Sequence, residues 1–388
     1  MGGAVQERGE SYPNTRRGGR YARAVRLWLI VGLIMVVGQI VIGGITRLTE
    51  SGLSITEWKP LSGAMPPLTT ADWQSEFEKY QTSPQYAKVF ADISMGDFKF
   101  IYFWEWFHRQ WARTMGLVFV VGFLVFWRKG YLDAPLMRRL GVVVLLAALA
   151  ASFGWIMVAS GLIDRPWVNA YKLTLHLALG ITLFGYLLWV TLKVIQPRLA
   201  GFPQAGVEKL RWPLNILLGV QLLLGGVMSG AKAALPYPTW PDMNGKFIPN
   251  ILTDASAWTV ENLVNYETSL FQPALFQLLH RTMAYALTIM VLYFVYRCWR
   301  GIRSHDLRRA NALLISLLIT QVLLGILTVT NSIGQVPVGW GVAHQFTAIA
   351  LVATVVYINY LFRPGRPLRP VEKTVENEAK KSLKLVEP

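Results

Sequence analysis

The sequence predicts an all-α membrane protein with eight transmembrane helices, arranged as two parallel four-helix bundles related by a pseudo-two-fold axis. Three observations support this fold class. Of the 388 residues, 53% are hydrophobic and only 15% are charged, and the mean hydropathy of +0.37 is too high for an ordinary soluble protein. Eight apolar windows are each long enough to cross a bilayer as a helix. Many residues also recur at a fixed spacing in the two halves of the chain.

The apolar windows are separated by polar turns and by two long loops. A polar, arginine-rich tail at 1–26 precedes the first window, and a second polar tail at 363–388 follows the last. Because a helix satisfies its own backbone hydrogen bonds in hydrocarbon, each window is expected to be helical. The windows cover residues 27–48, 99–127, 140–163, 170–194, 213–231, 270–296, 310–330 and 340–362.

Lysine and arginine residues predict the orientation in the membrane. They concentrate in both tails and in the turns at 128–139, 193–211 and 297–309. Under the positive-inside rule these segments face the cytoplasm, so both termini are expected to be cytoplasmic. The net charge of +16 is thus explained by membrane topology, and no nucleic-acid partner is expected.

An internal duplication divides the chain into two bundles, 27–194 and 213–362, joined by a cytoplasmic linker at 195–212. Each half contains four windows. An even number makes the repeats parallel, with an axis along the membrane normal. Residues shared at one offset of 182 are Gly43, Gly44, Leu53, Trp58, Gly63 and Pro67, which recur as Gly225, Gly226, Leu235, Trp240, Gly245 and Pro249; the offset is 171 at Gly154 and Gly325.

Four of the five histidines lie inside apolar windows. His108, His176, His280 and His344 fall on the second, fourth, sixth and eighth helices, whereas His305 is expected in a polar inner loop. Ionisable residues within membrane helices are costly and usually functional. Two imidazoles on different helices of each half are the axial ligands that a haem iron needs. A closed zinc site is disfavoured because the chain has a single cysteine and too few ligands per half.

The duplication fails next to these histidines. Glu105 precedes His108 by three residues and shares its helix face, but the corresponding residue before His280 is Gln277. A carboxylate beside only one of two haem sites indicates proton chemistry at that site and electron transfer at the other. The alternative is that Glu105 only neutralises a neighbouring arginine.

Residues that flank the histidines allow two interpretations each. Arg109 and Arg281 follow their histidines, and each would pair with a haem propionate or with a loop carboxylate. The glycine pairs at 43–44 and 225–226 would admit a flat macrocycle or, more commonly, a neighbouring helix. An aromatic run would line a porphyrin or anchor the helix at the membrane interface; it comprises Tyr102, Phe103, Trp104, Trp106, Phe107 and Trp111.

Three features of the sequence belong together. The first is the run Gly-Gly-Ile-Thr-Arg-Leu-Thr-Glu-Ser-Gly-Leu-Ser-Ile-Thr-Glu-Trp-Lys-Pro at 43–60, the second is the run Glu-Trp-Phe-His-Arg at 105–109, and the third is the three later membrane histidines. Together they resemble the haem (heme) A synthase family, in its alphaproteobacterial and mitochondrial branch. The resemblance covers about residues 25–362. It implies that the C8 methyl group of haem O is oxidised to the formyl group of haem A by two successive hydroxylations and a dehydration. The product would serve the assembly of terminal haem-copper oxidases such as cytochrome c oxidase.

The resemblance also implies a role for each site residue. His108 and His176 would be the axial ligands of the substrate haem, and Glu105 would be the catalytic acid or base. His280 and His344 would ligate the iron of a resident haem b (heme b). The N-terminal bundle would then be the catalytic half and the C-terminal bundle the haem b half. Some bacterial relatives carry a cysteine pair in their outer loops, which this chain lacks.

Partners and location follow from the same resemblance. The implied partners are haem O and haem A, the lipid bilayer, haem O synthase, an electron donor and, as a candidate homo-oligomer, further copies of the chain. The implied location is the bacterial inner membrane, ahead of the mitochondrial inner membrane. Two other functions stay open. A dihaem b-type electron-transfer cytochrome without synthetic activity would carry equivalent carboxylates in both halves or in neither. A transporter built on the parallel repeat would need polar residues near the bilayer midplane.

Overall fold

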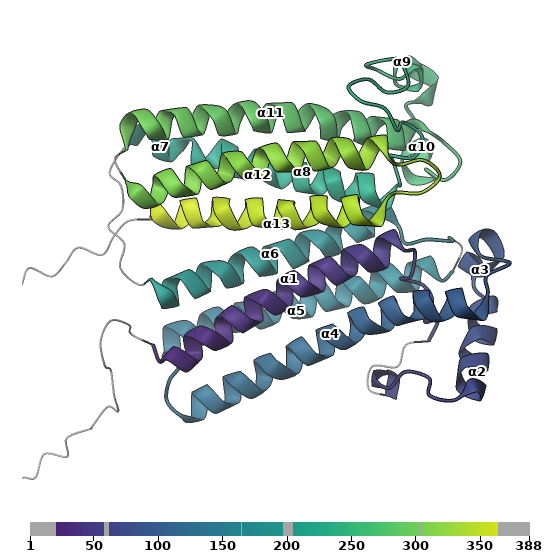
Figure 1. Ribbon diagram of the computed structural model, residues 1–388, viewed down its shortest axis with the longest axis horizontal. Helices are drawn as coiled ribbons and strands as arrows, with labels where there is room; N and C mark the ends of the chain where they lie inside the picture. The colour runs from purple at the N-terminus through teal and green to yellow at the C-terminus, as the bar shows by residue number, and fades with distance from the viewer. Residues whose placement is uncertain (1–20, 58–61, 164, 197–204, 303, 364–388) are drawn as a thin grey trace, which may run out of the picture.

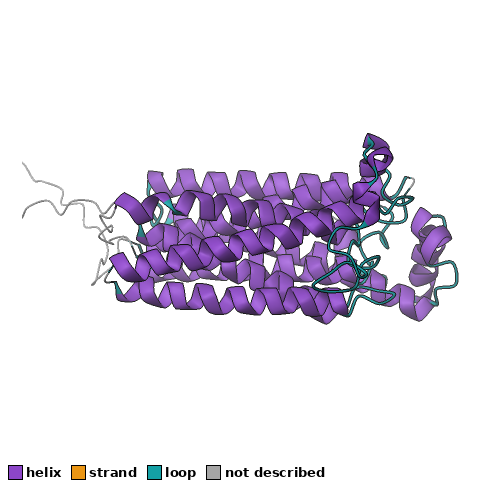
Figure 2. Ribbon diagram, turned by 90° about the horizontal axis from the view of Figure 1, so that it is seen from above, coloured by secondary structure: helices purple, strands orange, loops and turns teal. Residues whose placement is uncertain are grey.

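The computed structural model is helical and elongated (Figures 1 and 2). Within the described residues it forms helices, turns and loops and no named β-strand. Most of the two predicted tails (1–20 and 364–388), part of the linker between the bundles and Trp58 lie outside the described residues. The structure describes residues 21–57, 62–163, 165–196, 205–302 and 304–363.

Eight helices among the described residues are long and apolar enough to cross a membrane. They confirm the all-α fold class and correspond one to one with the eight windows. Each reaches beyond or close to the ends of its window, because helical hydrogen bonding continues through the polar residues at the membrane surface. They are α1 (Arg23–Leu48), α4 (Met95–Arg128), α5 (Ala134–Gly161), α6 (Ala170–Ile195), α8 (Arg211–Gly230), α11 (Phe271–Gly301), α12 (His305–Thr330) and α13 (Val338–Leu361).

The expectation that His305 lies in a loop is wrong. His305 is the first residue of α12, and its side chain is exposed. Helix α12 begins there because the hydroxyl of Ser304 accepts a hydrogen bond from the backbone N–H of Leu307, which satisfies one of the free donors of the first turn.

The spanning helices run side by side along the long axis of the molecule (Figure 1). The start of α1 and the end of α13 lie at the same end, and the two long loops gather at the other (Figures 1 and 2). The first of these loops contains η1 (Ser62–Ala64), α2 (Thr70–Gln81) and α3 (Pro84–Val89). The second contains α9 (Asn250–Thr253), η2 (Ala255–Ala257) and α10 (Val260–Val264), and α7 (Ala205–Lys209) precedes α8 at the opposite end.

Aromatic contacts hold the first long loop against the N-terminal end of α4. Tyr80 is fully buried, and its ring centroid lies 5.2 Å from that of Phe98. The Trp73 ring packs edge-on against Tyr102 at 5.1 Å. Buried aromatic pairs of this kind add about 0.5–1.5 kcal/mol each beyond their area. The loop is therefore a packed cap above the N-terminal half of the molecule.

Each half contributes the same two helices to the junction between the halves. We call α1, α4, α5 and α6 the N-terminal half, and α8, α11, α12 and α13 the C-terminal half. Gly44 of α1 leaves no room for a Cβ beside Gln345 of α13, and at its counterpart Gly226 of α8 an added Cβ would lie 3.0 Å from the side chain of Thr174 of α6. In both contacts the first spanning helix of one half meets the last spanning helix of the other, and the pseudo-two-fold arrangement stays a prediction.

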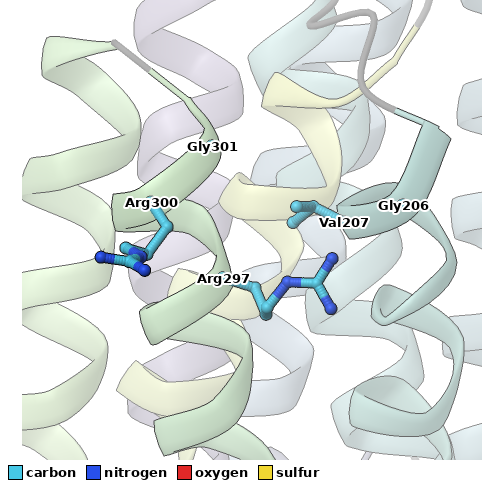
Figure 3. Close-up of a pocket in the computed structure, with 5 residues that line it drawn as sticks. All are labelled: Gly206, Val207, Arg297, Arg300 and Gly301. Carbon is cyan, nitrogen blue, oxygen red and sulfur yellow. The ribbon is translucent and has the colours of Figure 1, made fainter.

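A pocket of about 260 Å³ lies at the end of the molecule away from the long loops, between α7 and the end of α11. Figure 3 shows the side chain of Arg297 directed toward Gly206 and Val207 of α7, and that of Arg300 directed away from them. The Arg297 guanidinium donates a hydrogen bond to the Tyr293 hydroxyl at 2.8 Å. Because this pocket is remote from the membrane histidines, it is separate from the candidate site.

Candidate functional site

The structure brings the four membrane histidines together as two pairs. His108 on α4 lies near His176 on α6, and His280 on α11 lies near His344 on α13. Each pair lies within one half and joins two different helices, as the sequence predicted. All four imidazoles are half-buried.

Each imidazole packs against a glycine on the spanning helix that precedes its own. A side chain at any of these glycines would collide with the ring, because an added Cβ would come within about 3 Å of the imidazole Cε1. The glycines therefore set the position of each ring. The distances from an added Cβ to Cε1 are 2.9 Å for Gly43 and His108, 2.9 Å for Gly154 and His176, 3.1 Å for Gly225 and His280, and 3.0 Å for Gly325 and His344.

A glutamine side-chain amide also contacts three of the four imidazoles. Each of these glutamines lies one helical turn before the glycine that packs on the same imidazole. The distances between the amide Nε2 and the imidazole Nε2 are 3.1 Å for Gln39 and His108, 3.2 Å for Gln221 and His280, and 3.1 Å for Gln321 and His344. The fourth position is Ala150. Sequence reasoning missed these residues, although the pattern Gln-x-x-x-Gly occurs in the first, fifth and seventh spanning helices.

Backbone carbonyls fix the orientation of at least two rings. The Nδ1 atom of His176 lies 2.9 Å from the carbonyl oxygen of Ala150, and that of His344 lies 3.1 Å from the carbonyl oxygen of Gln321. An imidazole whose Nδ1–H donates to a carbonyl presents an unprotonated Nε2, which is the form that ligates a metal.

The donor set fits a haem iron better than a bare metal ion. The described residues contain no cluster of three or more His, Cys, Asp or Glu side chains that would hold a metal ion on their own. Each half instead supplies two imidazoles, which complete the coordination of an iron already held by a macrocycle. The Oε1 atoms of Gln39, Gln221 and Gln321 are buried without a hydrogen-bond partner, so the surroundings of the histidines contain polar atoms that the protein alone does not satisfy.

The Glu105 carboxylate is buried, with only 3% of the residue exposed. Its Oε1 accepts a hydrogen bond from Arg109 Nη2 at 2.5 Å. Its Oε2 accepts one from the Ser54 hydroxyl and one from the Ile55 backbone N–H, each at 2.8 Å. A buried carboxylate needs such partners. The first long loop thus folds down onto Glu105, one helical turn from His108.

Gln277 occupies the corresponding place in the C-terminal half and is fully buried. Its amide nitrogen donates to the backbone carbonyl of Tyr237 at 2.9 Å, and its Oε1 has no hydrogen-bond partner. Tyr237 is the counterpart of Ile55 in the repeat. The same loop position therefore donates to an acid in one half and accepts from an amide in the other.

The two arginines after the histidines hold the two long loops. Arg109 donates to Glu105 and also to the carbonyl oxygen of Ile55 at 3.3 Å. Arg281 donates to the carbonyl oxygens of Asp242 at 2.6 Å and Thr239 at 2.7 Å. These contacts account for both arginines as supports of the loops, and pairing with haem propionates stays a prediction.

Most of the aromatic run on α4 serves packing. The indole N–H of Trp106 donates to the Ala64 carbonyl at 3.1 Å, and that of Trp111 donates to the Met35 carbonyl of α1 at 2.8 Å. The rings of Phe103 and Phe107 stack on each other at 5.6 Å. The tryptophans therefore tie α4 to the first loop and to α1, and the lining of a porphyrin or anchoring at the membrane interface stays a prediction.

Eight spanning helices that enclose two pairs of imidazoles, one of them beside a buried carboxylate, define a polytopic membrane protein with two bis-histidine sites. The chain belongs to the cytochrome oxidase assembly protein family, whose model matches residues 26–356.

Curated relatives match the chain over most of its length. One from Rhodospirillum centenum, named "Heme A synthase", is 40% identical over 343 residues, or 88% of this chain and 89% of that protein. Proteins of the same name from Nitrosospira multiformis and Flavobacterium johnsoniae are 38% and 35% identical, and they cover 88% and 86% of this chain and 94% and 96% of their own lengths.

Proposed function

We propose that the protein is a haem A synthase, which oxidises the C8 methyl group of haem O to the formyl group of haem A for the assembly of terminal oxidases. The observation that carries this proposal is the buried Glu105 carboxylate beside only one of two otherwise similar histidine pairs. Membership of a family whose curated members are named "Heme A synthase" supports it.

In this proposal the two halves have different tasks. His108 and His176 hold the substrate haem in the N-terminal half, each ring positioned by its glycine. His280 and His344 hold a haem b in the C-terminal half. When bound, that haem supplies one-electron transfer at a potential set by its ligands and its burial. The polar neighbour of His280 is the neutral Gln277, which suits a site that moves electrons rather than protons.

Glu105 takes and returns protons beside the substrate. Oxidation of a methyl group to a formyl group removes hydrogen in two steps and ends with loss of water from a hydrated carbon, so protons must leave and return near C8. Arg109, Ser54 and Ile55 keep the carboxylate in one orientation. Pre-positioning of this kind reduces the reorganisation required at each proton transfer.

The difference between Glu105 and Gln277 also discriminates against a dihaem electron-transfer cytochrome, because such a protein has no use for an acid in one half alone. The test is acid-acetone extraction and chromatography of the haems from purified protein. We expect haem O, its hydroxylated intermediate or haem A together with haem b. Haem b alone, in an amount that fills both sites, would instead identify an electron-transfer protein.

We also propose a location in the bacterial inner membrane with both termini in the cytoplasm. Turns that are rich in lysine and arginine alternate along the chain with connections that are poor in both, and this alternation supports the orientation. Haem O synthase and an electron donor are the partners that the reaction requires, since one supplies the substrate and the other exchanges electrons with the haem b half.

A further inference from the structure

Glu105 has three hydrogen-bond partners in the described part of the chain, and all three donate to it. Arg109 reaches Oε1 at 2.5 Å, and Ser54 and Ile55 each reach Oε2 at 2.8 Å. A guanidinium and a backbone N–H can only donate, so they fit the ionised carboxylate. The proposed function requires more, because a group that takes and returns protons must also be held in place while it carries one.

Ser54 differs from the other two partners because a hydroxyl group both donates and accepts. Its Oγ lies within hydrogen-bond distance of three acceptors: Glu105 Oε2 at 2.8 Å, the Ser51 carbonyl at 2.9 Å and the Ile101 carbonyl at 3.3 Å. The hydroxyl has a single hydrogen, so it donates to one of them at a time. Whenever Ser54 donates to Glu105, two other acceptors therefore remain within its reach.

Reversal of one hydrogen bond lets the same atoms hold a protonated Glu105. When Oε2 gains a proton, the new O–H donates to Ser54 Oγ, and the Ser54 hydrogen turns about the Cβ–Oγ bond to the Ser51 carbonyl. Oε2 still accepts from the Ile55 N–H, because a carboxylic acid keeps acceptor capacity. One O–H bond forms at Oε2 and breaks again when the proton leaves, while Ser54 keeps its own hydrogen. A proton on Oε1 would instead face the Arg109 guanidinium, which has no acceptor.

Burial makes this exchange of partners necessary. Only 1% of Ser54 is exposed, and a buried donor that loses its acceptor is costly. If every partner of Glu105 were a fixed donor, a proton on Oε2 would leave one donor unmatched. Tyr80 is another buried hydroxyl near Glu105, but it donates to Gln85 Oε1 at 3.1 Å. Ser54 is therefore the reversible partner that Glu105 has among the described residues.

The internal repeat supports the same role for Ser54. Ser54 corresponds to Pro236 and Glu105 to Gln277, so the C-terminal half lacks the hydroxyl as well as the acid. The Gln277 amide donates to the Tyr237 carbonyl, and an amide that does not titrate needs no reversible partner. The hydroxyl and the acid thus occur together, in the half to which we assign proton transfer.

We propose that Ser54 is a positioning residue for Glu105, whose hydroxyl donates to the ionised carboxylate and accepts from the protonated acid. The inference rests on the proposed function, in which Glu105 carries protons beside the substrate haem. Because only a hydrogen turns, both states of the acid keep the same place one helical turn from His108. This lowers the reorganisation at each proton transfer, so a serine of the first long loop helps to set the rate of the reaction.

The test compares Ser54→Ala, which removes the hydroxyl, with Ser54→Thr, which keeps it. The full chain is assayed in membranes of the expressing cells with added haem O, and haem A is measured by chromatography of extracted haems. In Ser54→Ala we expect kcat to fall about tenfold while the KM for haem O stays at the parental value. Ser54→Thr should recover most of the loss in kcat.

The matched control is Ser83→Ala, which should keep the parental kcat. Ser83 is a buried serine of the same loop, but its hydroxyl accepts from the Tyr86 backbone N–H and has no contact with Glu105. A loss of rate that came only from loosening of the loop would appear in this control as well.

A spectroscopic measurement tests the reversal without turnover. The C=O stretching band of protonated Glu105 is identified in acid-minus-neutral infrared difference spectra of the purified protein by its absence in Glu105→Gln. In Ser54→Ala we expect this band at a higher frequency, because the acid O–H has lost its acceptor. In Ser54→Thr and Ser83→Ala the band should stay at its parental position.

A parental kcat or an unshifted band in Ser54→Ala would overturn the inference, and so would a parent without the band. If Ser54→Ala loses its resident haem and so its fold, Ser54→Cys takes its place, because a thiol donates and accepts only weakly. A parental band in Ser54→Cys would then overturn the inference. A parent whose band shifts as expected on loss of the hydroxyl but which makes no haem A would contradict the proposed function alone.

Discussion

Glu50 and Lys232 occupy the same position of the repeat, 182 residues apart, and they form an ion pair across the junction between the two halves. Both adopt the left-handed backbone conformation, with φ of 58° and 51°, as the chain leaves α1 and α8. The Lys232 ammonium also lies 4.4 Å from the centroid of the Trp167 ring, and burial lowers its pKa while Glu50 opposes that shift. A contact between counterparts is expected where a two-fold axis passes.

We predict that this pair stabilises the junction. Lys232→Ala leaves the Glu50 carboxylate without its partner in a largely buried place, so the free energy of unfolding should fall by about 1–3 kcal/mol. Thermal unfolding in detergent measures the change. Because the two residues are counterparts, the charge-swapped variant Glu50→Lys/Lys232→Glu should recover most of the loss. A swap no more stable than the single variant would show that charge pairing is not the cause.

The second prediction concerns Glu105→Gln. The variant should keep the resident haem but lose haem A production, with haem O or its hydroxylated form accumulating. An amide places an N–H₂ group against Arg109 or against the Ser54 and Ile55 donors, so we also expect a loss of about 1–3 kcal/mol in stability. Chromatography of extracted haems gives the first result and thermal unfolding gives the second.

Gln277→Glu is the matched control for that variant, because it makes the opposite change at the corresponding place. It should leave haem A production intact and destabilise the C-terminal half, since a carboxylate there faces the Tyr237 carbonyl. If Glu105→Gln converts haem O at the parental rate, Glu105 is only a charge partner of Arg109 and has no catalytic role.

The third prediction is that His280 and His344 are the axial ligands of the resident haem and that glycine holds each ring in place. His344→Ala should abolish the low-spin bis-imidazole spectrum. Gly325→Ala should shift or weaken it, because the new Cβ comes within 3.0 Å of the His344 ring and such overpacking costs about 1–3 kcal/mol. Gly339→Ala, on the same helix as His344 with open space around it, should have a parental spectrum. An unchanged spectrum in both His280→Ala and His344→Ala would place the haem elsewhere.

The fourth prediction is a pH dependence of the second long loop. Hydrogen bonds from the Thr239 hydroxyl and the Gly245 backbone, with Arg281 nearby, hold the pKa of Asp242 below its usual value of 3.8. A lowered carboxyl pKa contributes stability above pH 3.8, and that contribution is lost as the pH falls through the lowered value. The protection of the loop amides against hydrogen exchange, corrected for the intrinsic pH dependence of the exchange rate, should therefore fall below pH 3.8. In Asp242→Asn this part of the fall should be missing; an equal fall in both proteins would assign it to other groups.

The fifth prediction is topological. A reporter fused after Pro388 that works only outside the cytoplasm should be inactive, and the same reporter inserted after Lys246 in the second long loop should be active. The reverse result would invert the orientation given by the positive-inside rule.

Membrane insertion explains why so much of the fold could be predicted. A span needs about twenty apolar residues whatever its neighbours are, so the eight helices and their histidines are visible in the sequence alone. Helix ends were less accurate, as at α4, which begins at Met95 because the Ser94 hydroxyl accepts from the Asp97 backbone N–H. The Ser54 and Ile55 contacts to Glu105 depend on how a long loop folds, which no periodicity encodes.

The glycine-histidine contact occurs four times, once in each successive pair of spanning helices, so the smallest repeating unit is a helical hairpin rather than a four-helix bundle. The first helix of each hairpin offers the glycine, and the second offers the imidazole. One hairpin supplies one axial ligand, so a bis-histidine haem needs two of them. A chain of a single hairpin would thus have to dimerise to hold a haem. In the present chain the two hairpins of each half are covalently linked. Covalent linkage lets each hairpin diverge separately, so that one pair has an acid beside it, Glu105, where the other has an amide, Gln277.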